Sequence, residues 1–166
     1  MDIFDNEILR FWKSLQDNHV KYLMIGGFAI NIHGFQRYTA DLDIWIEDST
    51  VNRKNLRKAL IELDMGDYPS LETMQFVPGW SDFKLNNGLQ LDILTNMKGL
   101  EDFTFDECLK VATEAAIADV IVPFLNIDHL LQNKKTVNRS KDQIDVIELK
   151  RIIQLRKIPD SDQTAS

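Results

Sequence analysis

The sequence feature that most constrains the fold is the stretch "DLDIWIE" at residues 41–47, in which polar and apolar side chains alternate strictly. Alternation of period two is typical of a β-strand with one buried face, and here it places Asp41 and Asp43 together on the other face. The Cβ atoms of residues i and i+2 in a strand lie within ~7 Å of each other. Two carboxylates held that close repel, so one must take up a proton or the pair must recruit a cation.

A third aspartate follows the same pattern in "LQLDIL", residues 89–94, where Gln90 and Asp92 alternate with aliphatic residues. If this strand lies beside residues 41–47, Asp92 completes a three-carboxylate cluster. Mg²⁺ and Mn²⁺ prefer such oxygen ligands, and a cluster of this kind can hold two metal ions for in-line displacement at phosphorus. Asp82 in "SDFKLN" is the alternative third acid. Asp92 is favoured because its apolar neighbours would bury one face of the strand.

A double glycine, Gly26 and Gly27, follows the apolar run "KYLMI" and precedes "FAINIHG", which we expect to be a short helix. Glycine has no side chain, so backbone N–H groups and a helix N-terminus can approach a phosphate closely at this point. The sequence therefore places a candidate phosphate-binding turn just before the strand that carries the two aspartates.

The remaining pattern predicts an α+β fold, a mixed sheet with helices at both ends of the chain. Amphipathic helices are expected near residues 4–15 and 56–63, a hairpin turn at "NNG", an extended pair over 112–125, and two closing helices. Ser140 and Gln143 are expected to form a capping box at the start of the last helix. We expect one domain over residues 1–156, with a sheet-centred lobe about 1–100 and a mostly helical lobe about 101–156. A disordered tail, 157–166, follows.

Composition narrows the class of protein. The chain has 166 residues and a net charge of −7, so any nucleic-acid partner would need a local basic patch on an acidic body. The single cysteine, Cys108, excludes an internal disulfide and fits a reducing compartment. The longest apolar run is too short to cross a bilayer, and no signal segment is visible. We therefore expect a cytoplasmic protein with no membrane partner.

The stretch "GGFAINIHGFQRYTADLDIWIE" resembles the signature of the DNA polymerase β-like nucleotidyltransferase superfamily, a glycine-rich helical turn followed by a hydrophobic–Asp–hydrophobic–Asp strand. Its R-x-T-x-D-L-D form is similar to the small bacterial branch that includes abortive-infection toxin nucleotidyltransferases. A second stretch, "LLQNKKTVNRSKDQID", resembles the K-x4-R-x-K-D-x2-D segment of that branch. The resemblance spans roughly residues 20–155, and its matching positions in the second stretch are Lys134, Arg139, Lys141, Asp142 and Asp145.

The resemblance implies roles for individual residues. It implies that Asp41, Asp43 and Asp92 hold Mg²⁺ or Mn²⁺ in a two-metal site and act in catalysis together with Lys134. It implies nucleotide binding by a second set: Gly26, Gly27, Arg37, Thr39, Arg139 and Lys141. The implied enzyme is a metal-dependent nucleotidyltransferase, which moves a nucleotide from a nucleoside triphosphate to a hydroxyl of RNA, a protein or a small molecule.

Three functional settings follow from this resemblance. The first is a toxin–antitoxin or abortive-infection component with an antitoxin partner. The second is an antibiotic-modifying nucleotidyltransferase, which an acidic protein surface suits if the acceptor is a cationic small molecule. The third is a non-catalytic relative that binds nucleotide without turnover.

Three further side chains carry predictions. Lys134 lies one turn beyond Leu130 and Leu131, so its stem should follow the buried face of its helix while its exposed ammonium extends past that face to the triphosphate. Its removal should then leave the stability of the protein unchanged. Asp142 falls on the apolar stripe of the last helix and should point inward, paired with Arg37 or Arg139. Trp45 shares the face of the aspartates and is a candidate for stacking on a nucleobase.

Overall fold

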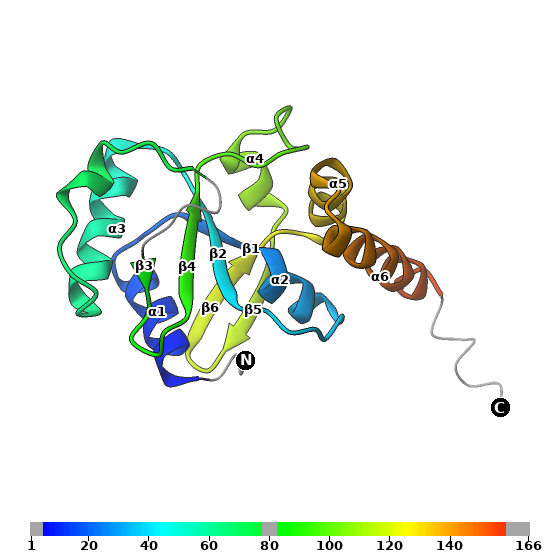
Figure 1. The fold of residues 1–166 in the computed structure, drawn as a ribbon, viewed down its shortest axis with the longest axis horizontal. Helices are drawn as coiled ribbons and strands as arrows, with labels where there is room; N and C mark the ends of the chain where they lie inside the picture. Colours follow the sequence, from blue (N-terminus) through cyan, green and yellow to red (C-terminus); the bar gives the residue numbers. More distant parts are fainter. Residues whose placement is uncertain (1–4, 78–82, 159–166) are drawn as a thin grey trace.

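The computed structural model describes residues 5–77 and 83–158, and this part of the chain forms an open mixed sheet flanked by helices (Figure 1). The strands occur in the order β3-β4-β2-β1-β6-β5 across the sheet. Their bounds are β1 (Tyr22–Ile25), β2 (Asp41–Ile46), β3 (Phe83–Lys84), β4 (Gln90–Leu94), β5 (Thr113–Ile117) and β6 (Val120–Phe124). The predicted α+β class, a mixed sheet with flanking helices, is confirmed.

The pairing of the central strands determines where the polar face of the sheet lies. Strand β2 pairs antiparallel with β1 and parallel with β4, and Asp43 lies opposite Asp92 in that parallel register. The predicted turn at "NNG" joins β3 and β4 as an antiparallel hairpin. Strands β5 and β6 form a second hairpin, and β6 joins the same sheet through a parallel contact with β1. The sheet therefore takes strands from both sides of residue 100.

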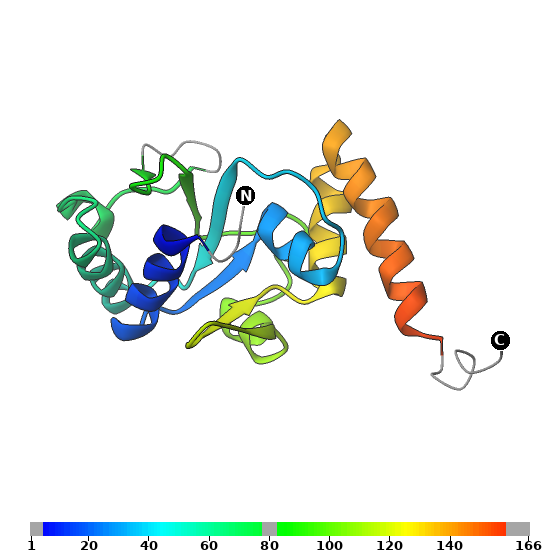
Figure 2. The ribbon, with the colours of Figure 1, turned by 90° about the horizontal axis from the view of Figure 1, so that it is seen from below.

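The helices gather in two groups. Helices α1 (Asn6–Asp17) and α3 (Thr50–Glu62) contact each other at one end of the molecule. At the other end, α5 (Ile127–Val137) packs on α6 (Ser140–Arg156), and both contact the short helix α2 (Gly26–His33). Helix α6 extends away from the sheet (Figure 2). The remaining helical elements are a 3-10 turn, η1 (Pro69–Glu72), and α4 (Phe105–Lys110).

The hydrophobic core confirms the predicted alternation of β2. Leu42, Ile44 and Ile46 are fully buried, whereas Asp41 and Asp43 are only half-buried on the opposite face. Helix α1 presents a buried aromatic stripe that includes Trp12, which stacks on Tyr22 of β1. Each large apolar side chain buried in this way contributes about 1.5–3 kcal/mol. The core thus holds β2 rigidly on one face and leaves its other face available for polar chemistry.

One local expectation is corrected, and two others lie wholly or mostly outside the described residues. Helix α6 begins with Arg139 as its N-cap, and its first-turn partner is Asp142, which accepts a hydrogen bond from the Arg139 backbone N–H at 3.0 Å. The predicted Ser140–Gln143 capping box is therefore wrong, because the acid that completes the cap lies one position earlier. Both Asp82 and most of the predicted tail, residues 159–166, lie outside the described residues. Within the described ranges, no helix combines the length and apolar character needed to cross a membrane.

Candidate active site

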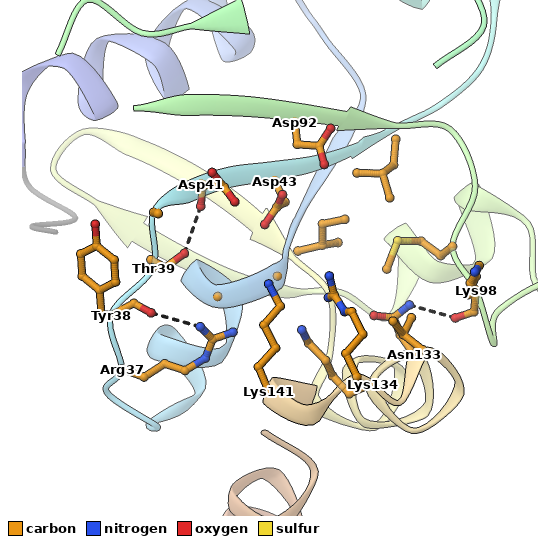
Figure 3. A pocket seen from close by; sticks show the side chains of 18 of the residues that line it. Arg37, Tyr38, Thr39, Asp41, Asp43, Asp92, Lys98, Asn133, Lys134 and Lys141 are labelled. Carbon is orange, nitrogen blue, oxygen red and sulfur yellow. Dashed lines mark hydrogen bonds between the residues drawn. The ribbon is translucent and has the colours of Figure 1, made fainter. Parts of the chain in front are cut away.

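A pocket of about 600 Å³ lies between the polar face of the sheet, the start of α2, and the pair of helices α5 and α6 (Figure 3). One wall carries Asp41 and Asp43 from β2 and Asp92 from β4, here called the sheet acids. The facing wall carries the cationic side chains predicted from the second motif, Lys134, Arg139 and Lys141. The structure therefore brings together both sequence stretches that carry the resemblance, although they lie about a hundred residues apart in the sequence.

The sheet acids repel one another. Asp43 and Asp92 are direct neighbours in the parallel register of β2 and β4, and Asp41 lies two residues before Asp43. Burial, together with the charges of Asp92 and Asp41, raises the pKa of Asp43 to about 7. The charged form of this carboxyl is therefore disfavoured in the protein alone, and a cation placed between the acids would restore it.

The double glycine makes room for this arrangement. Gly26 has a φ of +67°, and a Cβ built on it would overlap the carboxylate of Asp43. A Cβ on Gly27 would lie 2.6 Å from Oγ1 of Thr39. Thr39 is buried and donates a hydrogen bond to the backbone carbonyl of Asp41 at 3.1 Å. The glycines, the loop and the acidic strand therefore pack against one another without space for further side chains.

Lys134 is not exposed as the sequence predicted. It is 5% exposed, and its Nζ lies 2.9 Å from Oδ1 of Asp142 and 3.3 Å from Oδ2 of Asp145. Both aspartates are fully buried. They lie three residues apart on α6 and so project from one face of that helix toward α5. The ammonium of Lys134 is therefore held inside an ion-pair network between α5 and α6, on the side of the pocket that faces the sheet acids.

Two arginines complete this network. Arg37, from the loop before β2, places Nε 2.8 Å and Nη2 3.1 Å from the carboxylate oxygens of Asp145. Arg139 places Nε 2.7 Å from Oδ2 of Asp142. The predicted pairing of Asp142 with an arginine is confirmed for Arg139, whereas Arg37 pairs with Asp145 instead. We call Asp142 and Asp145 the α6 acids.

Asp142 is held in its charged form. Burial alone would raise the pKa of Asp142, but hydrogen bonds from Arg139 and Lys134 lower it to about 2. Three cationic side chains surround two carboxylates, so the network carries a surplus of positive charge. That surplus faces the sheet acids across the pocket.

Lys141 differs from the other cations of this wall. It is exposed, lines the pocket, and forms no ion pair with a carboxylate among the residues that the structure describes. Its charge, with that of Lys134, partly offsets the raised pKa of Asp43. Figure 3 shows its side chain directed toward the sheet acids. Lys141 is therefore available to bind an anionic group in the pocket.

The donor set of the sheet acids fits a hard divalent cation. Across residues 5–77 and 83–158, no group of three or more His, Cys, Asp or Glu side chains is placed to hold a metal ion by itself. Mg²⁺ needs no such closed set, because it is commonly held by one or two carboxylates, water molecules and substrate phosphates. The fit rests on the raised pKa of Asp43, which burial and the charges of Asp92 and Asp41 cause and which a bound cation would offset.

Several pocket residues were not predicted from the sequence, and one predicted candidate is excluded. Tyr38, Lys98 and Asn133 line the pocket, and Asn133 donates a hydrogen bond to the backbone carbonyl of Lys98 at 2.9 Å. Only Tyr38 had a local signal, its position between Arg37 and Thr39. Trp45 is 4% exposed and packs edge-on against Phe105. It belongs to the core and cannot stack on a nucleobase.

Comparison with protein families shows which family the chain matches. A family model described as "Nucleotidyl transferase of unknown function (DUF2204)" matches residues 5–162 of the chain. A comparison with curated protein sequences finds no match.

Several solved structures share the fold. The chain is similar to ANT(2")-Ia, solved in complex with adenylyl-2"-tobramycin, with 17% identity, a TM-score of 0.55, and coverage of 90% of this chain and 92% of that one. It is also similar to the lincosamide antibiotic adenylyltransferase LnuA in its lincomycin-bound form, with 18% identity, a TM-score of 0.57, and coverage of 89% and 97%. An antigenic nucleotidyltransferase-like protein from Paracoccidioides brasiliensis aligns with 18% identity, a TM-score of 0.53, and coverage of 90% and 73%. At these identities the likeness shows a common fold.

Proposed function

Since the chain belongs to this nucleotidyl transferase family, within the DNA polymerase β-like superfamily that its motifs resemble, we propose that it transfers a nucleotide from a metal-bound nucleoside triphosphate to an acceptor hydroxyl. The observation that carries the proposal is the pocket with three carboxylates on one wall and unneutralised positive charge on the other. A triphosphate with divalent metal ions complements both walls at once.

The metal would be held by the sheet acids, Asp41, Asp43 and Asp92, with Mg²⁺ or Mn²⁺ as the expected ion. When bound, it would stabilise negative charge on the attacking and leaving oxygens. The binding of the ion would also favour the ionised form of Asp43, whose pKa is raised to about 7 without it.

The residues of this chain supply the remaining steps. The backbone N–H groups of Gly26 and Gly27, at the start of α2, would bind oxygens of the triphosphate, and Lys141 would offset the charge that builds up on the leaving pyrophosphate. The acceptor oxygen would form a bond to the α-phosphorus as the bond from that phosphorus to the bridging oxygen breaks. Asp92, on the outer of the two acidic strands, would take the proton that the acceptor hydroxyl loses.

We further propose a small molecule as the acceptor. The chain aligns with nearly the full length of two antibiotic-modifying enzymes. The structure of ANT(2")-Ia contains adenylyl-2"-tobramycin, and that of LnuA contains lincomycin. The net charge of this chain, −7, favours a cationic acceptor over RNA. The R-x-T-x-D-L-D motif supports the second candidate, a toxin that modifies RNA or protein and is held in check by an antitoxin.

The test is label transfer from each of the four NTPs, labelled on the α-phosphate, in the presence of Mg²⁺ or Mn²⁺. The acceptors offered are aminoglycosides, lincosamides, RNA and cell lysate. Transfer to a small molecule supports the first acceptor class, and transfer to RNA or protein supports the second. The matched control is the double variant Asp41→Asn/Asp43→Asn, which should transfer no label. Metal-dependent NTP binding without transfer to any acceptor would identify a non-catalytic binding module and contradict the proposed reaction.

A further inference from the structure

The pocket has two ends of different character, and the proposed reaction uses only the part between them. Tyr38, at one end, is 76% exposed, and Lys98 lies at the other end (Figure 3). The end at Lys98, here called the α5 slot, is more enclosed, since Met97 is 5% exposed and Val137 is half-buried. The residues that line the α5 slot are Leu94, Asn96, Met97, Lys98, Asn133 and Val137. The slot therefore combines apolar side chains with carboxamides.

The segment after β4 is fastened to α5, which gives the slot a fixed shape. Nε2 of Gln132 donates a hydrogen bond to the backbone carbonyl of Gly99, and Nδ2 of Asn133 donates one to the backbone carbonyl of Lys98 at 2.9 Å. Gly99 allows this close approach, because a Cβ built on it would overlap Oγ1 of Thr136. The wall that the segment contributes to the slot is therefore held in place before any ligand binds.

The hydrogen bond to Lys98 also determines which way the carboxamide of Asn133 is turned. A backbone carbonyl can only accept a hydrogen bond, so the group that faces it is the NH2 group, and Oδ1 lies on the other side. Figure 3 shows this oxygen directed away from Lys98, toward the middle of the pocket. Among residues 5–77 and 83–158, no side chain or backbone group donates a hydrogen bond to Oδ1 of Asn133. The slot therefore contains an oriented acceptor that is free to bind a ligand.

A nucleobase has the chemistry that this slot complements. Its flat faces can pack on Leu94, Met97 and Val137, and its edge carries hydrogen-bonding groups. Adenine and cytosine present an exocyclic amino group, which donates, whereas guanine and uracil present a carbonyl oxygen at the corresponding position. A carbonyl oxygen that faces Oδ1 of Asn133 would leave two acceptors without a proton between them, which costs free energy. The slot therefore favours adenine and cytosine over guanine and uracil.

We propose that the α5 slot binds the base of the nucleoside triphosphate, and that Asn133 determines specificity by accepting a hydrogen bond from the exocyclic amino group of adenine or cytosine. This inference rests on the proposed function, because it takes the triphosphate to lie between the sheet acids and Lys141. Asn133 directly precedes Lys134 on α5, so a base in the slot lies next to the wall that faces those acids. The open end at Tyr38 is then left for the acceptor, which must enter and leave.

The first experiment compares matched nucleotides on the wild-type chain by calorimetry, with Mg²⁺ and without an acceptor. ATP is compared with inosine triphosphate, and CTP with UTP, because the members of each pair differ in whether an amino group or a carbonyl oxygen occupies the same position. In at least one pair, the nucleotide with the carbonyl oxygen should bind about tenfold to a hundredfold more weakly. The comparison of ATP with CTP shows whether the slot takes a purine or a pyrimidine.

The second experiment removes the acceptor. Asn133→Ala should bring the affinity ratio within that pair close to one, while Mg²⁺-dependent binding of the triphosphate remains. The matched control is Gln132→Ala, because Gln132 holds the same segment through Gly99 but does not line the pocket. If Asn133 only fastened the segment, both variants would change the ratio alike. We expect Gln132→Ala to keep the wild-type ratio, and circular dichroism checks that both variants keep their helical content.

Three results would overturn this assignment and leave the proposed reaction standing. The first is Mg²⁺-dependent binding with equal affinities within both pairs, or with a preference for inosine triphosphate and UTP. The second is a ratio that persists in Asn133→Ala, since another group would then recognise the base. The third is an unchanged ratio in Asn133→Ala together with a raised KM for the acceptor, which would assign the slot to the acceptor. The absence of Mg²⁺-dependent binding for all four nucleotides would instead contradict the proposed function, and this inference with it.

Discussion

Asp43 is half-buried on β2 and Asp142 is fully buried on α6, and their pKa values shift in opposite directions. Burial and two neighbouring acids raise the pKa of Asp43 to about 7. Burial acts in the same direction on Asp142, but hydrogen bonds from Arg139 and Lys134 outweigh it and lower the pKa to about 2. The difference lies in the partners that each carboxyl has within the chain.

This contrast separates a structural group of acids from a candidate functional one. The α6 acids have cations of this chain around them and are complete without a ligand. Asp43, by contrast, lies beside Asp92 and Asp41, and burial together with their charges raises its pKa, which a bound cation would offset. Strongly raised pKa values that arise from like charges in a cleft are typical of functional sites. Four predictions test this contrast, beginning with the largest expected effect.

Asp142→Asn should destabilise the protein by about 3–5 kcal/mol, because it removes a buried negative charge and leaves Lys134 and Arg139 without part of their compensation. The measurement is urea denaturation followed by circular dichroism. Asp17→Asn is the control, since the Asp17 side chain is 52% exposed in its ion pair with Lys13, and its effect should stay within about 1 kcal/mol. Equal stabilities of the two variants would show that the α6 acids are not structural.

Asp43→Asn should have the opposite effect to Asp142→Asn: it should lower activity and leave stability intact. Nucleotidyl transfer should fall by about a hundredfold to a thousandfold, because the variant removes a proposed metal ligand. The thermal midpoint in the absence of metal should stay the same or rise, because repulsion among the sheet acids is reduced. Activity is measured with the acceptor identified by label transfer, and stability by calorimetry. A variant that is unstable but fully active would reverse the assignment of the two groups.

Lys134 and Lys141 allow the same comparison between a structural and a functional residue, here for two lysines. Lys134→Ala should lower the stability by about 3 kcal/mol, because two buried carboxylates lose a shared partner. Lys141→Ala should leave the stability within about 0.5 kcal/mol and weaken the use of the nucleotide by about tenfold to a hundredfold in kcat/KM. The stability of Lys134→Ala is compared at matched pH with that of the wild type. An unchanged melting temperature for Lys134→Ala would show that its ion pairs contribute little.

The pH dependence of stability should differ in sign between the two acids. The folded pKa of Asp43 lies above its ordinary value of 3.8, so its contribution to stability is present below about pH 4 and is lost as the pH rises through 7. The folded pKa of Asp142 lies below 3.8, so its contribution is present above about pH 4 and is lost as the pH falls through about 2.

This prediction is checked by comparing the pH profiles of unfolding free energy for wild type and Asp43→Asn in metal-free buffer. The difference between the two profiles should change between about pH 4 and 7. A constant difference across that range would mean that Asp43 titrates as an ordinary carboxyl.

The sheet acids could be placed from the sequence because a strand has a simple local period. Alternation alone assigned Asp41 and Asp43 to one face. The sequence made the role of Asp92 conditional on its strand lying beside that of Asp41 and Asp43, and the structure pairs the two strands. The burial of Lys134 could not be found in this way. It depends on Asp142 and Asp145, which a different helix brings to it across the α5–α6 contact.

The start of α6 was missed for a related reason. The S-x-x-Q pattern at Ser140 satisfies a local rule, but the Asp142 carboxylate bonds to both the backbone and the side chain of Arg139 and places the cap one residue earlier. Pocket residues such as Lys98 and Asn133 also had no sequence signal. Their position follows from how the segment after β4 lies against α5.

The most direct test of the central claim is titration calorimetry of a non-hydrolysable nucleoside triphosphate, with and without Mg²⁺, on wild type and Asp41→Asn/Asp43→Asn. If the sheet acids form the metal and nucleotide site, the wild type binds the nucleotide tightly only with Mg²⁺, and the double variant loses that Mg²⁺-dependent binding while keeping its fold. Equal Mg²⁺-dependent binding by both proteins would contradict the account.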